Sequence, residues 1–289
     1  MTTTETQYCY RHPDRETGLS CSDCGRPICA DCANFGPVGI RCPDHASVRQ
    51  SPAARLKPRP VRRAPGVALA SGQAPVTRAL IAINVAIYLI TVFQSHSTTP
   101  NGSIVTRFLL FGPAVAHGDW WRLVTAMFLH ASILHIGFNM YVLWVIGTPV
   151  EQYLGKMRYL GLYFVSGLAG SAGALLQSPL TPVLGASGAI FGILGAMMIL
   201  EWQVTGRLAG QAAALVAINL GLSFVIPNIS WGGHVGGLIG GILIMLAYAH
   251  WGKRGRAQYG QLGLGGILGL VAVAAGSVAV AYLRVRGLA

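Results

Sequence analysis

The stretch LGASGAIFGILGAMMILE, residues 184–201, consists almost entirely of small and apolar side chains. A helix of about 20 apolar residues is long enough to cross the hydrocarbon core of a bilayer. Six further stretches have this character, and none of the seven carries Asp, Glu, Lys or Arg in its interior. These six lie near residues 77–93, 123–146, 159–177, 208–226, 231–250 and 262–283. The sequence therefore predicts an all-α polytopic membrane protein with seven spans.

The charged residues gather outside these stretches. They make up 10% of the 289 residues, against about 25% in an average soluble domain. Lys and Arg occur before the first span and in alternate loops, whereas the loops 178–183 and 227–230 carry no charge. Because basic loops stay cytoplasmic, we expect a cytoplasmic N-terminus and an extracytoplasmic C-terminus. The net charge of +12 is then explained by orientation in a lipid bilayer, and we expect no nucleic-acid partner.

Three parts follow one another along the chain. Residues 1–46 are rich in Cys and His, and residues 47–76 are rich in Pro, Arg, Ala and Gly without a helical or strand period. The second part is typical of a flexible basic linker near anionic lipid. Residues 77–289 hold all the predicted spans. The polar N-terminus resembles neither a signal peptide nor a transit peptide, which favours a multi-pass protein of a bacterial plasma membrane.

The first part contains all six cysteines of the chain. With two histidines they form four pairs in which two residues separate the members: Cys9 and His12, Cys21 and Cys24, Cys29 and Cys32, and Cys42 and His45. Eight such ligands suit two tetrahedral zinc ions and leave none over for an open catalytic position. Three disulfides are the alternative, which a cytoplasmic location disfavours and which gives the histidines no role. We therefore predict two structural zinc ions.

Polar residues inside membrane spans are costly and mark functional sites. The second, fourth and sixth predicted spans cross the membrane in the same direction. The second carries His130, His135 and Asn139, the fourth opens with Ser187, and the sixth opens with His234. Small residues four apart in the fourth and sixth spans would let these helices approach closely. We therefore expect the polar side chains to converge on one site in the outer half of the bilayer.

A serine beside an imidazole is typical of acyl transfer, because the imidazole removes the hydroxyl proton and activates a weak nucleophile. Ser187 begins a predicted helix, so its backbone N–H is free to bind the oxyanion of a tetrahedral intermediate. His135 and Asn139 are four residues apart, hence on one helix face, and can donate hydrogen bonds from the side. His130 lies about 140° around the same helix from His135 and is expected to play a supporting role.

These features resemble the rhomboid family of intramembrane serine proteases. The matching motifs are Trp121-Arg122, His130 with His135 and Asn139, Gly185-Ala186-Ser187-Gly188, and Gly233-His234. The resemblance implies a six-helix core with a seventh C-terminal transmembrane helix, and a catalytic dyad of Ser187 and His234 without an acid. It implies an oxyanion site of His135, Asn139 and the Ser187 backbone. Supporting roles fall to His130, Gly185, Phe191, Trp121 and Arg122.

The resemblance also implies the substrates, which are transmembrane proteins whose helix unwinds and is cut near the outer membrane surface. The fifth span and the loop 227–230 are candidates for a lateral gate. Well-studied rhomboids often carry Tyr four residues after the nucleophile, stacked on the catalytic histidine, where this chain has Phe191. We expect the stacking to persist without the phenolic hydrogen bond.

The first part of the chain resembles B-box-type zinc fingers over residues 9–45. In that family ligand pairs alternate between the two metals. This implies one ion held by Cys9, His12, Cys29 and Cys32, and a second held by Cys21, Cys24, Cys42 and His45. Sequential pairing along the chain remains open. Such a module would bind a cytoplasmic protein partner.

Three other functions compete with proteolysis. A catalytically silent rhomboid-like binding or quality-control protein typically lacks the serine or the histidine, and both are present here. A transporter or proton channel would show acidic relays or matched broken helices, and the sequence shows neither. A membrane scaffold built around the zinc module is compatible with a protease, and partners captured through residues 1–46 would separate the two.

Overall fold

The computed structural model describes residues 7–35, 39–46, 74–208, 210–226, 229–251, 257–258 and 263–289. The chain divides into two compact units, residues 1–62 and 63–289. Residues 47–73 of the predicted linker and residues 227–228 of the predicted gate loop lie outside the described residues.

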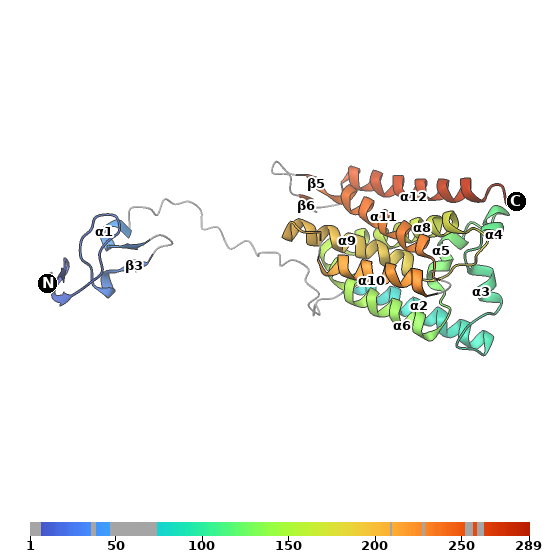
Figure 1. Cartoon of the computed structure of the whole chain (residues 1–289), viewed down its shortest axis with the longest axis horizontal. Helices are drawn as coiled ribbons and strands as arrows, with labels where there is room; N and C mark the ends of the chain where they lie inside the picture. The colour runs from blue at the N-terminus through green and yellow to red at the C-terminus, as the bar shows by residue number, and fades with distance from the viewer. Residues whose placement is uncertain are drawn as a thin grey trace. The chain divides into compact units, whose positions relative to one another are not determined.

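The N-terminal unit consists of short strands, turns and one short helix (Figure 1). Strand β1 (Tyr8–Cys9) pairs with β2 (His12–Glu16), and β3 (Asn34–Phe35) pairs with β4 (Ile40–Arg41), both antiparallel. A 3-10 turn, η1 (Ala30–Cys32), and a short helix, α1 (Pro43–Ala46), complete it. Its buried cluster contains five cysteines and a single aliphatic side chain, Ile28. So small an apolar core cannot stabilise a fold by burial alone.

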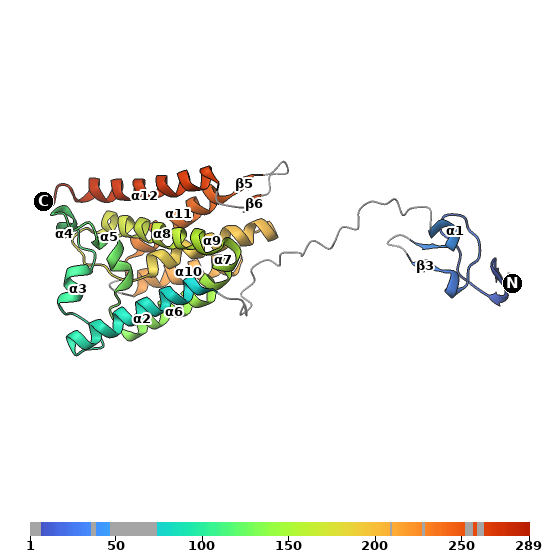
Figure 2. The same cartoon turned by 180° about the vertical axis from the view of Figure 1, so that it is seen from behind.

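The second unit is a helical bundle (Figures 1 and 2). Six of its described helical segments are long and apolar enough to cross a membrane. They are α2 (Pro75–Ser95), the continuous segment Ile133–Leu154, α8 (Lys156–Gln177), α9 (Ser187–Thr205), α11 (Trp231–Tyr248) and α12 (Leu264–Val285). The fifth predicted span becomes a shorter apolar helix, α10 (Gln211–Val225). This architecture confirms the predicted all-α polytopic membrane fold.

The second span begins later than predicted. The segment Ile133–Leu154 comprises α6 (Ile133–Val142), a π-helical turn η3 (Leu143–Gly147) and α7 (Thr148–Leu154). Two separate turns, α5 (Arg122–Thr125) and η2 (Ala126–Phe128), occupy the start of the predicted span 123–146. Ser132 ends this region as the N-cap of α6, since its side chain accepts a hydrogen bond from the His135 N–H. His130 therefore precedes the helix, and its predicted angular position on that helix was wrong.

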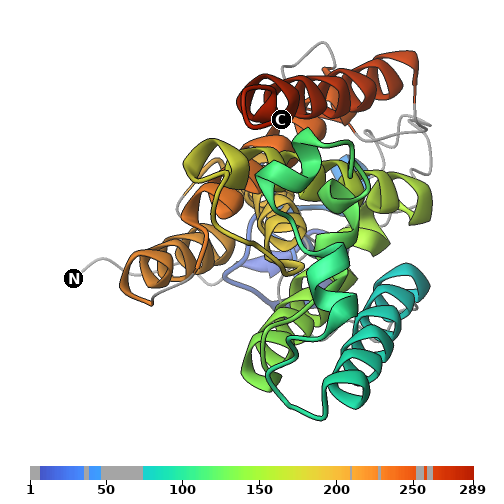
Figure 3. The ribbon, with the colours of Figure 1, turned by 90° about the vertical axis from the view of Figure 1, so that its right-hand side faces the viewer.

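Glycines bring three of the helices into backbone contact. A Cβ atom at Gly237 of α11 would lie 2.0 Å from the Gly188 carbonyl oxygen of α9, and one at Gly241 would lie 2.1 Å from that of Gly192. A Cβ atom at Gly173 of α8 would lie 2.2 Å from the carbonyl oxygen of Gly232. The predicted close approach of the fourth and sixth spans is confirmed, and α8 shares it. Figure 3 shows these helices end on, with α10 at the periphery of the bundle.

Two acidic residues near helix ends cap the starts of other helices. The buried Glu151 carboxylate accepts hydrogen bonds from the N–H groups of Val76 and Thr77 and from the Thr77 hydroxyl. Glu201 accepts from the N–H of Ala212 at the start of α10. Negative charge at a helix N-terminus is favoured by the helix dipole. These carboxylates thus fix the N-terminal ends of α2 and α10, and neither contact was predicted from the sequence.

Candidate active site and metal clusters

Ser187 is the first residue of α9, and the segment before it is held on both sides. Leu110 and Val183 exchange two backbone hydrogen bonds, each 2.9 Å long. The N–H of Gly185 then donates to the carbonyl oxygen of Ala126 at 2.9 Å. Gly185 has φ +134°, a conformation that residues with a side chain rarely adopt. The path of the backbone into Ser187 is therefore set by the loop that precedes α6.

Arg122 organises that loop. Its side chain is buried, and its guanidinium donates to the carbonyl oxygens of Thr106 and Leu109 at 2.8 and 2.9 Å and to the Asp119 carboxylate at 2.9 Å. These bonds link helix α3 (Ser103–Phe108) to the turn that starts α5. Trp121, in contrast, is exposed. The Trp121-Arg122 motif thus shapes the loop, and the structure shows neither side chain touching Ser187.

His234 lies in the first turn of α11 and is buried. The helix starts at the N-cap Ser230, whose hydroxyl accepts from the Gly233 N–H at 3.1 Å. The Gln177 side-chain oxygen of α8 accepts from the Gly232 N–H at 2.7 Å. On its face the imidazole stacks on Phe191 of α9, with ring centroids 4.1 Å apart and planes 13° from parallel. The predicted stacking is confirmed, and it links α11 to the helix that Ser187 begins.

His135 faces the start of α9. A Cβ atom at Gly185 would lie 2.8 Å from Nε2 of His135 and 3.8 Å from Oγ of Ser187, so both polar atoms border the same point. Nδ1 of His135 accepts a hydrogen bond from the Ala131 N–H at 3.4 Å. A neutral imidazole has one N–H, and with Nδ1 as acceptor that hydrogen is on Nε2. The ring therefore presents a donor on the side of Ser187.

The other two polar residues of the predicted site, Asn139 and His130, both interact with His135. Asn139 is buried and donates to the carbonyl oxygen of His135 at 2.9 Å, which uses one of its two amide hydrogens within the helix. His130 is also buried and meets His135 edge-on, with ring centroids 5.1 Å apart. Neither ring nitrogen of His130 has a hydrogen-bond partner in the described structure. Among the described residues, neither side chain is hydrogen-bonded to Ser187.

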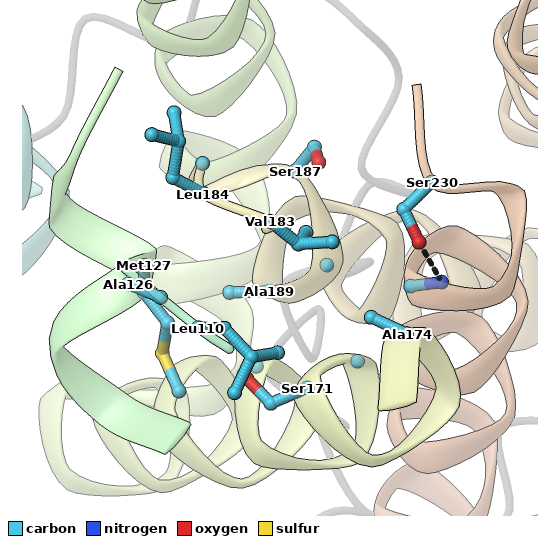
Figure 4. A pocket seen from close by; sticks show the side chains of 15 residues that line it. Leu110, Ala126, Met127, Ser171, Ala174, Val183, Leu184, Ser187, Ala189 and Ser230 are labelled. Atoms are coloured by element: carbon cyan, nitrogen blue, oxygen red, sulfur yellow. Dashed lines mark hydrogen bonds between the residues drawn. The ribbon is translucent and has the colours of Figure 1, made fainter. Parts of the chain in front are cut away.

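No hydrogen bond joins Ser187 to His234 in the described part of the chain. Catalytic hydrogen bonds are commonly long without substrate, so this geometry is compatible with a dyad. A cavity of about 30 Å³ borders Ser187, enough for about one water molecule. Figure 4 shows its lining, to which three different parts of the bundle contribute the side chains of Ser187, Ser171 and Ser230.

One contact of His234 was not predicted. Nδ1 of His234 lies 2.6 Å from Oγ of Ser223, a buried residue of α10. The sequence does carry a signal for it, because Asn219 and Ser223 are the polar residues in the interior of an otherwise apolar span, which also has Gln211 near its start, and they lie four positions apart on one helix face. Nothing in the sequence indicates that this face points to α11.

In the N-terminal unit the eight predicted ligands form two clusters. Within each cluster the ligand atoms lie within 4.8 Å of one another. One cluster contains Cys9, His12, Cys29 and Cys32, and the other contains Cys21, Cys24, Cys42 and His45. This is the alternating arrangement of pairs. The cysteines of this unit form no disulfide.

The spacing within the clusters fits tetrahedral zinc. Bonds of about 2.3 Å to sulfur and about 2.0 Å to nitrogen would place ligand atoms roughly 3.5–3.8 Å apart. Nδ1 of His12 lies 3.4 Å from the sulfur atoms of Cys29 and Cys32 and 3.8 Å from that of Cys9. In the second cluster the sulfur of Cys42 lies 3.9 Å from that of Cys24. These donor sets could hold two metal ions.

Cys9 is also suited to metal binding by its ionisation, whereas burial and the neighbouring thiols raise the pKa of Cys32 to about 11. Burial raises the pKa of the Cys9 thiol, but hydrogen bonds from the backbone N–H groups of Cys29 and Arg11 and from His12 outweigh it and lower the pKa to about 6. The thiolate is the form that binds zinc. Cys9 therefore carries the ligating charge at neutral pH.

Comparison with known proteins shows what the membrane unit is similar to. A family model described as a rhomboid domain matches residues 117–251. The rhomboid protease GluP of Bacillus subtilis is 33% identical over 244 residues, which cover 81% of this chain but 47% of that protein. This chain thus spans about half the length of GluP.

Two further relatives match over a greater share of their own length. RHOMBOID-like protein 6, mitochondrial, of Arabidopsis thaliana is 29% identical over 228 residues, or 74% of that protein. The putative rhomboid protease YdcA of Bacillus subtilis is 35% identical over 176 residues, which cover 59% of this chain and 86% of YdcA. Together with the matched domain and the bundle of apolar helices, this similarity shows that the chain belongs to the rhomboid family.

Proposed function

We propose that this protein is an intramembrane serine endopeptidase with Ser187 as nucleophile and His234 as base. The observation that carries the proposal is the meeting of three helix starts at one end of the bundle. Ser187 begins α9, His234 lies in the first turn of α11, and His135 lies in the first turn of α6. The names of the relatives GluP and YdcA support the same activity.

The reaction would proceed by acyl transfer. His234 takes the hydroxyl proton of Ser187 as Oγ attacks the substrate carbonyl, and the tetrahedral intermediate forms. As the peptide C–N bond breaks, His234 gives that proton to the leaving amine. Water, deprotonated by the same imidazole, then attacks the acyl-enzyme. The ester C–O bond breaks, and His234 returns the proton to Oγ of Ser187 as the second product leaves. No carboxylate takes part, because Glu151 and Glu201 cap helices and Asp119 pairs with Arg122.

The oxyanion of each intermediate would be stabilised by three candidate donors, one from the backbone and two from side chains. The N–H of Ser187, at the first helical position, has no partner within α9. The Nε2–H of His135 is the second, since Nδ1 is used as an acceptor. Asn139 is the third candidate through its remaining amide hydrogen. Loss of one oxyanion donor typically lowers kcat by about 100- to 1000-fold.

Substrates would be transmembrane proteins, cut near the outer membrane surface. A continuous helix hides its carbonyl groups in hydrogen bonds, so a cleavable segment must unwind first. The short helix α10, whose side chains Ile218, Phe224 and Val225 are exposed, is the proposed lateral gate. In this assignment the N-terminus is cytoplasmic, as the distribution of basic residues predicts.

For the N-terminal unit we propose two structural zinc ions in the two Cys/His clusters. Bound zinc would supply the folding energy that the small apolar core lacks. With all eight ligands engaged, the unit has no open coordination position for catalysis. Its proposed role is to bind a cytoplasmic protein partner of the protease.

The direct test is labelling of the detergent-solubilised protein with a fluorophosphonate probe. Wild type should label, and Ser187→Ala and His234→Ala should not. Ser277→Ala on α12, whose hydroxyl bonds only within its own helix, is the matched control and should label like wild type. A folded wild-type protein that does not label would overturn the proposal. That result would favour the catalytically silent rhomboid-like function. The lack of a hydrogen bond between the described side chains of Ser187 and His234 is also compatible with that function.

A further inference from the structure

Ser223 connects α10 to the imidazole of His234. The side chain of Ser223 is buried, and its Oγ lies 2.6 Å from Nδ1 of His234. The same hydroxyl lies 2.9 Å from the carbonyl oxygen of Asn219, one turn earlier in α10. Oγ thus has two polar neighbours, a carbonyl that can only accept a hydrogen bond and a ring nitrogen that can either donate or accept.

The number of hydrogens available decides whether Nδ1 of His234 donates or accepts. A serine hydroxyl has a single hydrogen. A carbonyl has no hydrogen to give, so the contact of 2.9 Å with the Asn219 carbonyl oxygen is a hydrogen bond only if the Ser223 hydroxyl donates. The contact at 2.6 Å is then a hydrogen bond only if Nδ1 of His234 carries a hydrogen and donates it to Oγ. A neutral imidazole has one N–H, so Nε2 is left with a free lone pair.

We infer that Ser223 is a positioning residue that holds His234 in the tautomer with Nε2 unprotonated. This inference rests on the proposed function, in which Nε2 is the base for Ser187. In a Ser-His-Asp triad a buried carboxylate accepts the Nδ1–H and fixes the same tautomer. Here a neutral hydroxyl, itself anchored to the Asn219 carbonyl, takes that place.

The surroundings of His234 leave this role to Ser223. Phe191 covers one face of the imidazole and offers no hydrogen-bond acceptor in the ring plane. The carboxylates of Asp119, Glu151 and Glu201 are bound to other groups of the described bundle. The acceptor also comes from a different helix than the base. The bond therefore joins α10 to α11 at the catalytic residue.

The test compares Ser223→Thr with Ser223→Val, because these two side chains have nearly the same shape and only Thr keeps the hydroxyl. For cleavage of a transmembrane substrate in liposomes, Ser223→Val and Ser223→Ala should lower kcat by roughly three- to ten-fold, the equilibrium effect of one neutral hydrogen bond. KM should change less than about two-fold, because the bond does not touch the substrate. Ser223→Thr should retain most of the wild-type kcat.

A second readout follows the tautomer itself. Solid-state NMR of protein labelled with 15N-histidine distinguishes protonated from unprotonated ring nitrogens, and His234→Ala identifies the signals of His234. In the wild type, Nδ1 should be protonated and Nε2 unprotonated, and the tautomers should mix in Ser223→Val but not in Ser223→Thr. A purely structural role of Ser223 would not change these signals.

The outcomes separate the inference from the proposed function. If wild type fails to label with the fluorophosphonate probe, the protease assignment fails first. If labelling depends on Ser187 and His234 but Thr and Val at position 223 behave alike, the inference is wrong while the protease assignment stands. An unprotonated Nδ1 in the wild type would also overturn the inference, whatever the activities.

Discussion

The ring of Phe191 stacks on the imidazole of His234 with centroids 4.1 Å apart, so the helix that Ser187 begins also supports the proposed base. Phe191 lies one turn after Ser187 on α9, and the two side chains share one rigid element. A displacement of α9 relative to α11 would therefore change both the stacking on His234 and the distance between nucleophile and base.

We first predict the effect of removing that stacking. Phe191→Leu keeps an apolar side chain but loses the ring contact, which is worth about 0.5–1.5 kcal/mol. Fluorophosphonate labelling should slow by roughly two- to ten-fold, because His234 gains freedom to rotate. Phe191→Tyr keeps the ring and should label at close to the wild-type rate. Equal rates for Leu and wild type would mean that the stacking does not position His234.

A second prediction concerns Gly185. Gly185→Ala places a methyl group 2.8 Å from Nε2 of His135 and should abolish labelling. Gly118→Ala is the matched control, since Gly118 also has positive φ, +106°, but a Cβ atom there has no neighbour within 4 Å. Both variants carry backbone strain, so only the clash with His135 distinguishes them. Similar labelling of the two proteins would contradict a role of His135 beside Ser187.

A third prediction tests the glycine contacts between α9 and α11. Gly241→Ala would place its Cβ 2.1 Å from the carbonyl oxygen of Gly192 and force the helices apart. Overpacking of this kind costs about 1–3 kcal/mol, which should lower the midpoint of thermal unfolding in detergent. Gly276→Ala on α12 meets no atom within 4 Å and should leave the midpoint unchanged or raise it. A stable Gly241→Ala protein would show that the two backbones are not in contact.

A fourth prediction tests the zinc clusters by metal content. Full-length wild type should contain two zinc ions per chain. The double variant Cys9→Ser with Cys32→Ser removes two ligands of one cluster and should retain one zinc ion. If the pairs were sequential, the same two changes would damage both sites and leave about none.

Chelation provides the control for this assignment. Removing zinc should make the N-terminal unit sensitive to limited proteolysis, because metal binding and folding are coupled. Labelling of Ser187 should continue, since the proposed metal ligands all lie in the other unit. An N-terminal unit that resists protease after chelation would show that metal does not stabilise it.

Much of the fold follows from local sequence patterns. Apolar runs predict the transmembrane helices because a span must bury its backbone polar groups in its own hydrogen bonds wherever it is placed. Small residues repeated every four positions likewise predicted that α9 and α11 touch, since the face they form belongs to each helix alone. The shortness of α10 and the late start of α6 were not predicted, because capping by Glu201 and Ser132 decides these boundaries.

The residues of the candidate site and the two zinc ligand sets were named from motifs, by residue type and spacing alone. The sequence by itself determined that serine, histidines and thiols are present, and it placed Ser187 and His234 at the starts of their helices but His130 wrongly within one. Only the tertiary structure decided which of them meet. The hydrogen bond from His234 to Ser223 joins two helices, and the contact of His135 with the start of α9 depends on a loop held by Arg122. Such contacts depend on how each helix is rotated and docked against its neighbours, and the small-residue faces of α9 and α11 do not determine how α10 or the loop before α6 packs against them.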